Sequence, residues 1–215
     1  SNIQTGTNIV EVEVMDADEI PVENAMITLL KGDDEIFISG ITGSNGKITL
    51  HFSDNTPGEV TVTVVKQDCI PSQGNFTILE GNIVLSVVEP DITVDDDSSG
   101  SSFGNNDGII NPAETLEFTI PVNNAGIETA VGISATLKSN SEFIEIIVDE
   151  IEIGDIGADE TISSNRFVVS IFPEILDGID LELFLEISSD TGETWVISIP
   201  GVVSGSRLNI EEVLI

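Results

Sequence analysis

Short runs of alternating apolar and polar residues, separated by turn-forming residues, are the feature that most constrains the fold of this chain. Residues 8–15, for example, alternate valine with glutamate, which is the period of a strand that buries one face. Turn signals such as Ser44-Asn45-Gly46 separate these runs. No window of about a dozen residues has the apolar spacing of an amphipathic helix without Gly, Pro or β-branched runs. The sequence therefore predicts an all-β chain.

The strand-forming runs fall into two sets, which are separated near Pro90 by an acidic, glycine-rich segment. Proline cannot donate to a strand ladder, so it favours a boundary there. Short strands with a turn every eight to twelve residues or so are typical of β-sandwiches. We predict two tandem antiparallel β-sandwich domains, residues 1–89 and 90–215. Two apolar rows compete for the first core: Ala25, Ile27 and Leu29, or Met26, Thr28 and Leu30.

The two ends of the sequence suggest a piece of a longer protein. It opens on Ser1-Asn2, which is typical of a remnant left by an expression vector, so we expect an excised fragment. Residues 208–213 fit either the last strand of the second sandwich or the first strand of a further unit.

The charge of the chain is strongly negative, because 39 acidic residues face 6 basic ones, a formal net charge of -33. Nucleic-acid binding needs a basic surface, and attraction to anionic lipid needs the same, so both are excluded as functions. No apolar run reaches the length of about 18 residues that a membrane span requires, so we expect no membrane insertion. The chain has one cysteine, Cys69, which excludes an intrachain disulfide and which we expect to be a buried thiol.

The acidic segment at residues 95–114 is the part of the sequence that points to a metal. It combines five carboxylates and three Asn side chains with three Gly. Ca2+ takes about six to eight oxygen ligands of these kinds, whereas zinc would need Cys and His ligands that the segment lacks. The alternative is a solvated acidic loop built from turn residues.

The second half of this segment resembles a calcium loop of the EF-hand or dockerin kind. In that resemblance the first ligand position falls on Phe103, which has no ligand oxygen, so we expect an aspartate from residues 95–97 to replace it. The residues after Glu114 alternate as a strand does, so the prediction is a calcium-binding loop that leads into a strand. The predicted ligands are Asp95, Asp96, Asp97, Asn105, Asp107, Ile109 (through its carbonyl), Asn111 and Glu114.

Three stretches of the first half resemble the immunoglobulin-like modules of bacterial surface proteins: VENAMITL at 22–29, TGSNGKITL at 42–50 and TPGEVTVTV at 56–64. They are similar in particular to the module that follows the catalytic domain of gingipain-like cysteine peptidases. A peptidase of that family needs a Cys-His dyad within hydrogen-bond reach. The chain offers only Cys69 at a strand end or loop and His51 on an outward strand position, so the resemblance implies a companion module and not the enzyme.

The second half resembles a repeat of secreted bacterial proteins with the pattern G-N-x-D-G-x-x-N-P-G-E-T, which residues 105–118 follow as NNDGIINPAETLEF. Ala113 stands where the pattern has Gly, so a left-handed backbone there would be strained. Together the resemblances imply two immunoglobulin-like sandwiches in a secreted or cell-surface bacterial protein, a gingipain-like peptidase among the candidates. They would form a non-catalytic structural or spacer module, stabilised by calcium.

The expected partners follow from that role. They are the catalytic or neighbouring domains of the same parent chain, or a host or surface protein. The alternative function is an adhesion or ligand-binding module for protein or carbohydrate. Carbohydrate is disfavoured because sugar platforms use exposed aromatic side chains, and the chain has no Tyr and one Trp, which alternation places in a strand core.

Overall fold

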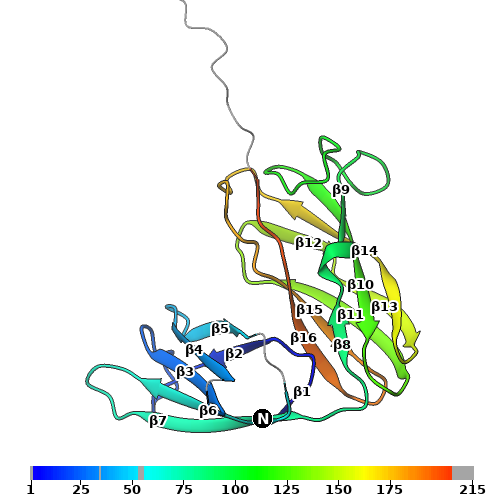
Figure 1. Ribbon diagram of the computed structural model, residues 1–215. Coiled ribbons are helices and arrows are strands. Elements are labelled where there is room, and N and C mark those ends of the chain that lie inside the picture. Colours follow the sequence, from blue (N-terminus) through cyan, green and yellow to red (C-terminus); the bar gives the residue numbers. More distant parts are fainter. Residues whose placement is uncertain (1, 34, 53–55, 205–215) are drawn as a thin grey trace, which may run out of the picture.

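The computed structural model describes residues 2–33, 35–52 and 56–204, and its regular structure is strand apart from one short 3-10 turn (Figure 1). The strands form two antiparallel immunoglobulin-like β-sandwiches in tandem, so the predicted fold class is confirmed. No helix in this described part is long and apolar enough to cross a membrane. The strand expected near residues 208–213 lies outside the described residues.

The first sandwich packs a five-stranded sheet against a two-stranded one. The larger sheet has the order β1-β7-β6-β3-β4, in which β1 runs parallel to β7 and the other neighbours are antiparallel. Its strands are β1 (Asn2–Gln4), β3 (Met26–Lys31), β4 (Ile36–Ile41), β6 (Gly58–Val65) and β7 (Ser72–Leu79). The smaller sheet pairs β2 (Ile9–Glu13) with β5 (Lys47–His51).

The choice between the two apolar rows of β3 is settled by burial. Ile27 and Leu29 are fully buried, as is Ala25 just before the strand, whereas Met26 and Leu30 are exposed on the opposite face. Successive side chains of a strand point to opposite faces, so one row must leave the core. The expectation of a buried Cys69 is wrong: its thiol is exposed in the turn between β6 and β7.

The second sandwich consists of two sheets with the orders β12-β14-β10-β8 and β13-β11-β15-β16, and β9 also pairs with β10. Its core is built around Phe118, Phe167 and Trp195, all fully buried. The elements are β8 (Leu85–Val87), η1 (Glu89–Asp91), β9 (Thr93–Asp95), β10 (Thr115–Asn124), β11 (Ala130–Ser139), β12 (Ile144–Val148), β13 (Glu150–Ile156), β14 (Glu160–Ile171), β15 (Leu183–Ser188) and β16 (Thr194–Ile199).

The two sandwiches have separate hydrophobic cores, one drawn from residues 27–78 and one from residues 85–203. They meet where the segment between β1 and β2 lies against β16 (Figure 1). We call this contact the joint and define it by Thr5, Thr7, Asn8 and residues 195–198. The predicted boundary between residues 89 and 90 stays a prediction.

Candidate functional site

The acidic segment forms the loop between β9 and β10, at the end of the second sandwich that lies away from the first (Figure 1). In the sequence it follows soon after the first set of strands, but β8, η1 and β9 run along the second sandwich before the loop begins. The predicted ligands are therefore far from the joint in space. This loop is therefore too far away to stiffen the contact between the sandwiches.

Asp96 is the buried centre of the loop, with 1% of its surface exposed. Its Oδ1 accepts a hydrogen bond from the backbone N–H of Gly108 (3.0 Å), and its Oδ2 accepts one from Asp107 (3.2 Å). Burial raises the pKa of Asp96, but backbone N–H donors, led by those of Gly108 and Asp107, outweigh burial and hold the pKa below its ordinary value. Asp96 is thus kept ionised, and its charge organises the turn around Gly108.

Glu114 is the second buried carboxylate, and it closes the other end of the loop. Its Oε1 accepts the N–H of Asn105 and its Oε2 the N–H of Asn111, each at 3.2 Å. Burial raises the pKa of Glu114 above its ordinary value despite these bonds, and the negative charges of Asp96 and Asp107 raise it further. The loop therefore contains carboxylates that repel one another.

A glycine lets the two buried carboxylates lie close to the loop backbone, and an alanine in the same loop has an unusual backbone conformation. Gly104 sits between them, because a Cβ there would lie 2.7 Å from the Cβ of Asp96 and 2.9 Å from the Cδ of Glu114. Ala113 has a φ of 66°, the left-handed conformation that the resemblance implied at this position. A side chain costs energy in that conformation, so the strain expected for Ala113 is present.

The other two aspartates of the triplet have different partners. Asp97 Oδ1 accepts bonds from the N–H and hydroxyl of Ser99 (2.8 and 2.7 Å) and from the hydroxyl of Ser102 (3.2 Å). The Ser99 bonds are the main reason that the pKa of Asp97 lies below its ordinary value. Asp95 Oδ2 accepts a bond from Nη1 of Arg166 at 3.1 Å.

Sequence reasoning missed Glu117 and Arg166, which hold the first half of the loop. Glu117 is buried beneath the loop, where it accepts the N–H of Ser101 at 2.8 Å and bonds to Arg166. The Ser101 N–H, followed by Arg166, lowers the pKa of Glu117. The sequence held one hint of this pair, because basic residues are rare in it. Arg166 is one of 6 lysines and arginines in the chain, and many acidic residues need a partner.

The remaining predicted ligands lie at the loop surface. Asp107 Oδ1 accepts the N–H of Ile109 (2.9 Å), and the Ile109 carbonyl accepts a bond from the Asn111 amide (3.0 Å). The carboxylate oxygens of the predicted ligands thus accept bonds from the chain's own N–H and hydroxyl groups. Among residues 2–33, 35–52 and 56–204 no three His, Cys, Asp or Glu side chains form a group that could hold a metal. Calcium binding stays a prediction.

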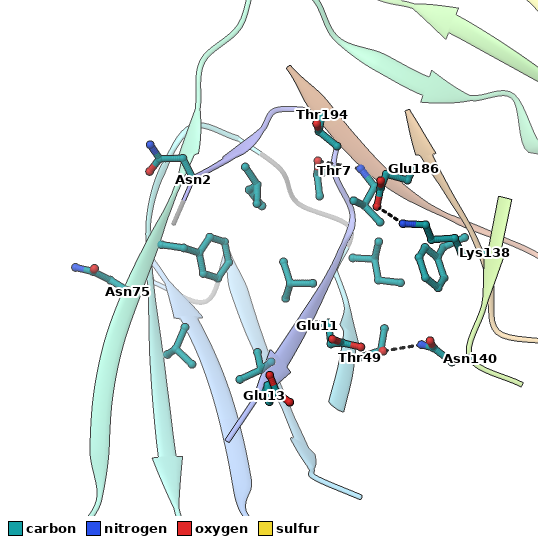
Figure 2. Close-up of a pocket in the computed structure, with 18 residues that line it drawn as sticks. Asn2, Thr7, Glu11, Glu13, Thr49, Asn75, Lys138, Asn140, Glu186 and Thr194 are labelled. Atoms are coloured by element: carbon teal, nitrogen blue, oxygen red, sulfur yellow. Dashed lines mark hydrogen bonds and ion pairs between the residues drawn. The ribbon is translucent and has the colours of Figure 1, made fainter. Parts of the chain in front are cut away.

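A second candidate site is a cavity of about 720 Å³ that opens between the sandwiches beside the joint. In Figure 2, β2 crosses its middle, with Asn2 and Asn75 on one side and Lys138 and Glu186 on the other. Lys138 Nζ lies 2.8 Å from Glu186 Oε2. The cavity is lined by apolar side chains and has this ion pair at its rim. Such a lining suits ligand binding better than catalysis.

The one histidine and the one cysteine do not share an element. His51 ends β5 in the two-stranded sheet, whereas Cys69 lies in the β6–β7 turn of the five-stranded sheet. His51 borders a smaller hollow of about 540 Å³ with Lys47 and Glu182, and Cys69 is not among its lining residues.

No family model and no curated protein matches this sequence. Among solved structures, a biofilm-associated protein BSP domain is 13% identical and covers 96% of this chain and 29% of its own, with a TM-score of 0.33. The native α2-macroglobulin of E. coli is 11% identical, with coverages of 95% and 16% and a TM-score of 0.40. The D0-D1 domain of intimin is 12% identical, with coverages of 94% and 93% and a TM-score of 0.27. The chain spans less than a third of the first two, and similarities this low carry no argument about function.

Proposed function

We propose that this chain is a non-catalytic structural module of a secreted or cell-surface bacterial protein, which holds neighbouring domains of its parent chain at a set spacing. The observation that carries the proposal is the joint. Trp195 Nε1 donates to the Thr5 carbonyl (3.1 Å), Asn8 N–H donates to the Val196 carbonyl (3.1 Å), and Ser198 N–H donates to Asn8 Oδ1 (2.9 Å). Rotation of one sandwich against the other would break these bonds.

The burial of side chains at the joint also supports a fixed contact between the two sandwiches. Thr7 is 1% exposed although it lies between two sandwiches, and its hydroxyl oxygen faces the N–H of Val196 at 3.4 Å. Farther along the interface the Asn140 amide donates to the Thr49 hydroxyl at 2.9 Å. Domains joined only by a linker are expected to move relative to one another, whereas a bonded and buried contact limits that motion.

The distance between two spin labels, one on each sandwich, tests the spacer role. Cys69, which is exposed, takes one label, and Ile147→Cys on β12 takes the other. We expect a narrow distance distribution by pulsed electron spin resonance, and a broader one in Asn8→Ala because the Ser198 N–H loses its acceptor. Glu23→Ala, an exposed change outside the joint, is the control and should leave the distribution narrow. A broad distribution in the unaltered joint would reject the spacer role.

We further propose that the acidic loop binds Ca2+ as a structural ion. The support is its oxygen-rich composition together with the state of Glu114: burial, and after it the negative charges of Asp96 and Asp107, raise the pKa of Glu114. A bound cation would relieve the repulsion among these carboxylates. At a Kd of about 10⁻⁴ M, 1 mM Ca2+ would add about 1.4 kcal/mol of stability. For a chain of this size we expect a rise of about 3–6 °C in the melting temperature.

The calcium measurement is thermal unfolding in 1 mM CaCl2, 1 mM MgCl2 or EDTA. Mg2+ prefers rigid octahedral sites and should shift the curve less than Ca2+ does. Melting curves that coincide in Ca2+ and EDTA would remove the calcium proposal and leave the spacer role standing, since the loop is remote from the joint.

The resemblance to companion modules of gingipain-like peptidases supports a place beside a catalytic domain, and the coding sequence of the parent protein tests it directly. The second candidate function is adhesion or ligand binding, favoured by the cavity beside the joint. Protein is the better ligand class than carbohydrate, because Trp195 is fully buried and gives no stacking platform.

A further inference from the structure

One edge of β2 has no strand partner in the described part of the chain. The sheet that contains β2 has only β5 beside it, although it faces a sheet of five strands. The bond from Val14 N–H to the Gly46 carbonyl (2.8 Å) continues the β2–β5 ladder, and bonded pairs alternate along an antiparallel ladder. The backbone N–H and C=O groups of Ile9, Glu11 and Glu13 therefore point to the open edge.

The cavity beside the joint lies along this open edge (Figure 2). Its apolar lining includes Ile3 of β1 and Val62 of β6, which are half-buried, and Phe76 of β7, which is 8% exposed. β2 is five residues long, so a segment of similar length would fit alongside it. An open strand edge next to an apolar surface is the arrangement that binds extended peptides by strand addition.

The charges around the edge select the occupant. Glu11, Glu13 and Glu186 line the cavity, but Glu11 pairs with Lys47 and Glu186 with Lys138, each at 2.8 Å. Glu13 of β2 is in no ion pair among the described residues, so it carries the unbalanced negative charge at the edge. The net charge of -33 adds a long-range attraction for cations. Since strand side chains alternate, an added strand could turn apolar groups to the five-stranded sheet and basic groups to Glu13.

We propose that the open edge of β2 captures an extended peptide segment of alternating apolar and basic residues as the third strand of the β2–β5 sheet. The segment belongs to a partner protein. This binding site goes beyond the spacer role and does not depend on calcium or on the acidic loop.

The first test uses the unmodified 215-residue protein and a fluorescein-labelled peptide, Lys-Val-Lys-Val-Lys-Val-Lys, in a fluorescence anisotropy titration. Two further peptides carry N-methyl groups on all valines or on all lysines. Successive residues of a strand direct their N–H groups to opposite edges, so one methylated peptide should bind at least tenfold more weakly and the other should keep its affinity. Equal affinities would show charge attraction alone and overturn the proposal, as would equal binding of a peptide with Glu in place of Lys.

The second test changes the edge itself. Glu13→Pro removes one open-edge N–H and no bond to β5, and we expect at least tenfold weaker binding. Glu13→Gln removes the same charge but keeps the N–H, so it should weaken binding by no more than about threefold. Ser39→Pro, on the open edge of β4, is the control for a proline on an edge strand and should bind as the unaltered protein does. Unchanged binding by Glu13→Pro would overturn the proposal; if that variant fails to fold, the methylated peptides decide.

Discussion

Replacement of Trp195 by Ala is expected to lower the free energy of unfolding by about 3–5 kcal/mol. The indole is fully buried in the core of the second sandwich, so the change leaves a large cavity among side chains that relax only in part. It also removes the N–H that binds the Thr5 carbonyl at the joint. Urea unfolding at 25 °C, followed by far-UV circular dichroism, measures the loss.

One further variant separates the packing of Trp195 from its hydrogen bond, and a second serves as the control. Trp195→Phe keeps much of the apolar volume but has no N–H, so we expect a smaller loss, about 1–2 kcal/mol. Val131→Ala, on the exposed face of β11, should stay within about 0.5 kcal/mol of the unaltered protein. A loss below about 1.5 kcal/mol for Trp195→Ala would contradict the central place given to this side chain.

Asp96→Ala is expected to cost about 2–4 kcal/mol at pH 7, the largest effect of any change in the acidic loop. The N–H groups of Asp107 and Gly108 lose a charged acceptor in a part of the loop where little water reaches them. Removal of the charge also lessens repulsion on Glu114, which offsets a minor part of the loss. Glu174→Ala, an exposed carboxylate outside the loop, is the matched control and should change stability by less than about 0.5 kcal/mol.

The pH dependence of Asp96→Ala has a definite sign. The pKa of Asp96 is lower in the folded chain than its ordinary value of 3.8, so its contribution is present above that value and is lost as the pH falls through the folded pKa. The difference in unfolding free energy between the two proteins should therefore shrink in acid, below about pH 4. A difference that stays constant from pH 7 to pH 3 would contradict the role of the ionised carboxylate.

Alternation predicted the strands well where one face alone is apolar. The residues after Glu114 alternate in this way, and the apolar ones in β10, which are Leu116, Phe118, Ile120 and Val122, are all fully buried. In β3 both faces are apolar, so the period of two could not choose between them. The row that is covered is the one that packs in the first core with side chains of β2 and β5, namely Ile27 and Leu29. The local pattern predicts that a strand forms there, and long-range packing determines which face it buries.

The sequence predicted which segment forms the candidate site, but not which partner each of its side chains binds. Three consecutive aspartates are chemically identical in the sequence, yet each has different hydrogen-bond partners in the structure. Asp96 bonds to the loop backbone, Asp95 to Arg166 and Asp97 to two serines. Each difference depends on a residue brought close by folding. The pairing of Glu117 with Arg166 spans 49 positions, and no local pattern encodes it.

The joint is assembled from the two extremes of the described chain, since the bonds from Trp195, Val196 and Ser198 to the segment before β2 span 189 to 190 positions. During synthesis at roughly 5–20 residues per second, the first sandwich leaves the ribosome several seconds before its docking strand exists. Each core can collapse on its own, but their mutual orientation can be set only when β16 emerges. The relative orientation of the two sandwiches is thus set late in synthesis. In a stalled or truncated chain without β16, the first sandwich would fold but would have no fixed orientation relative to the rest.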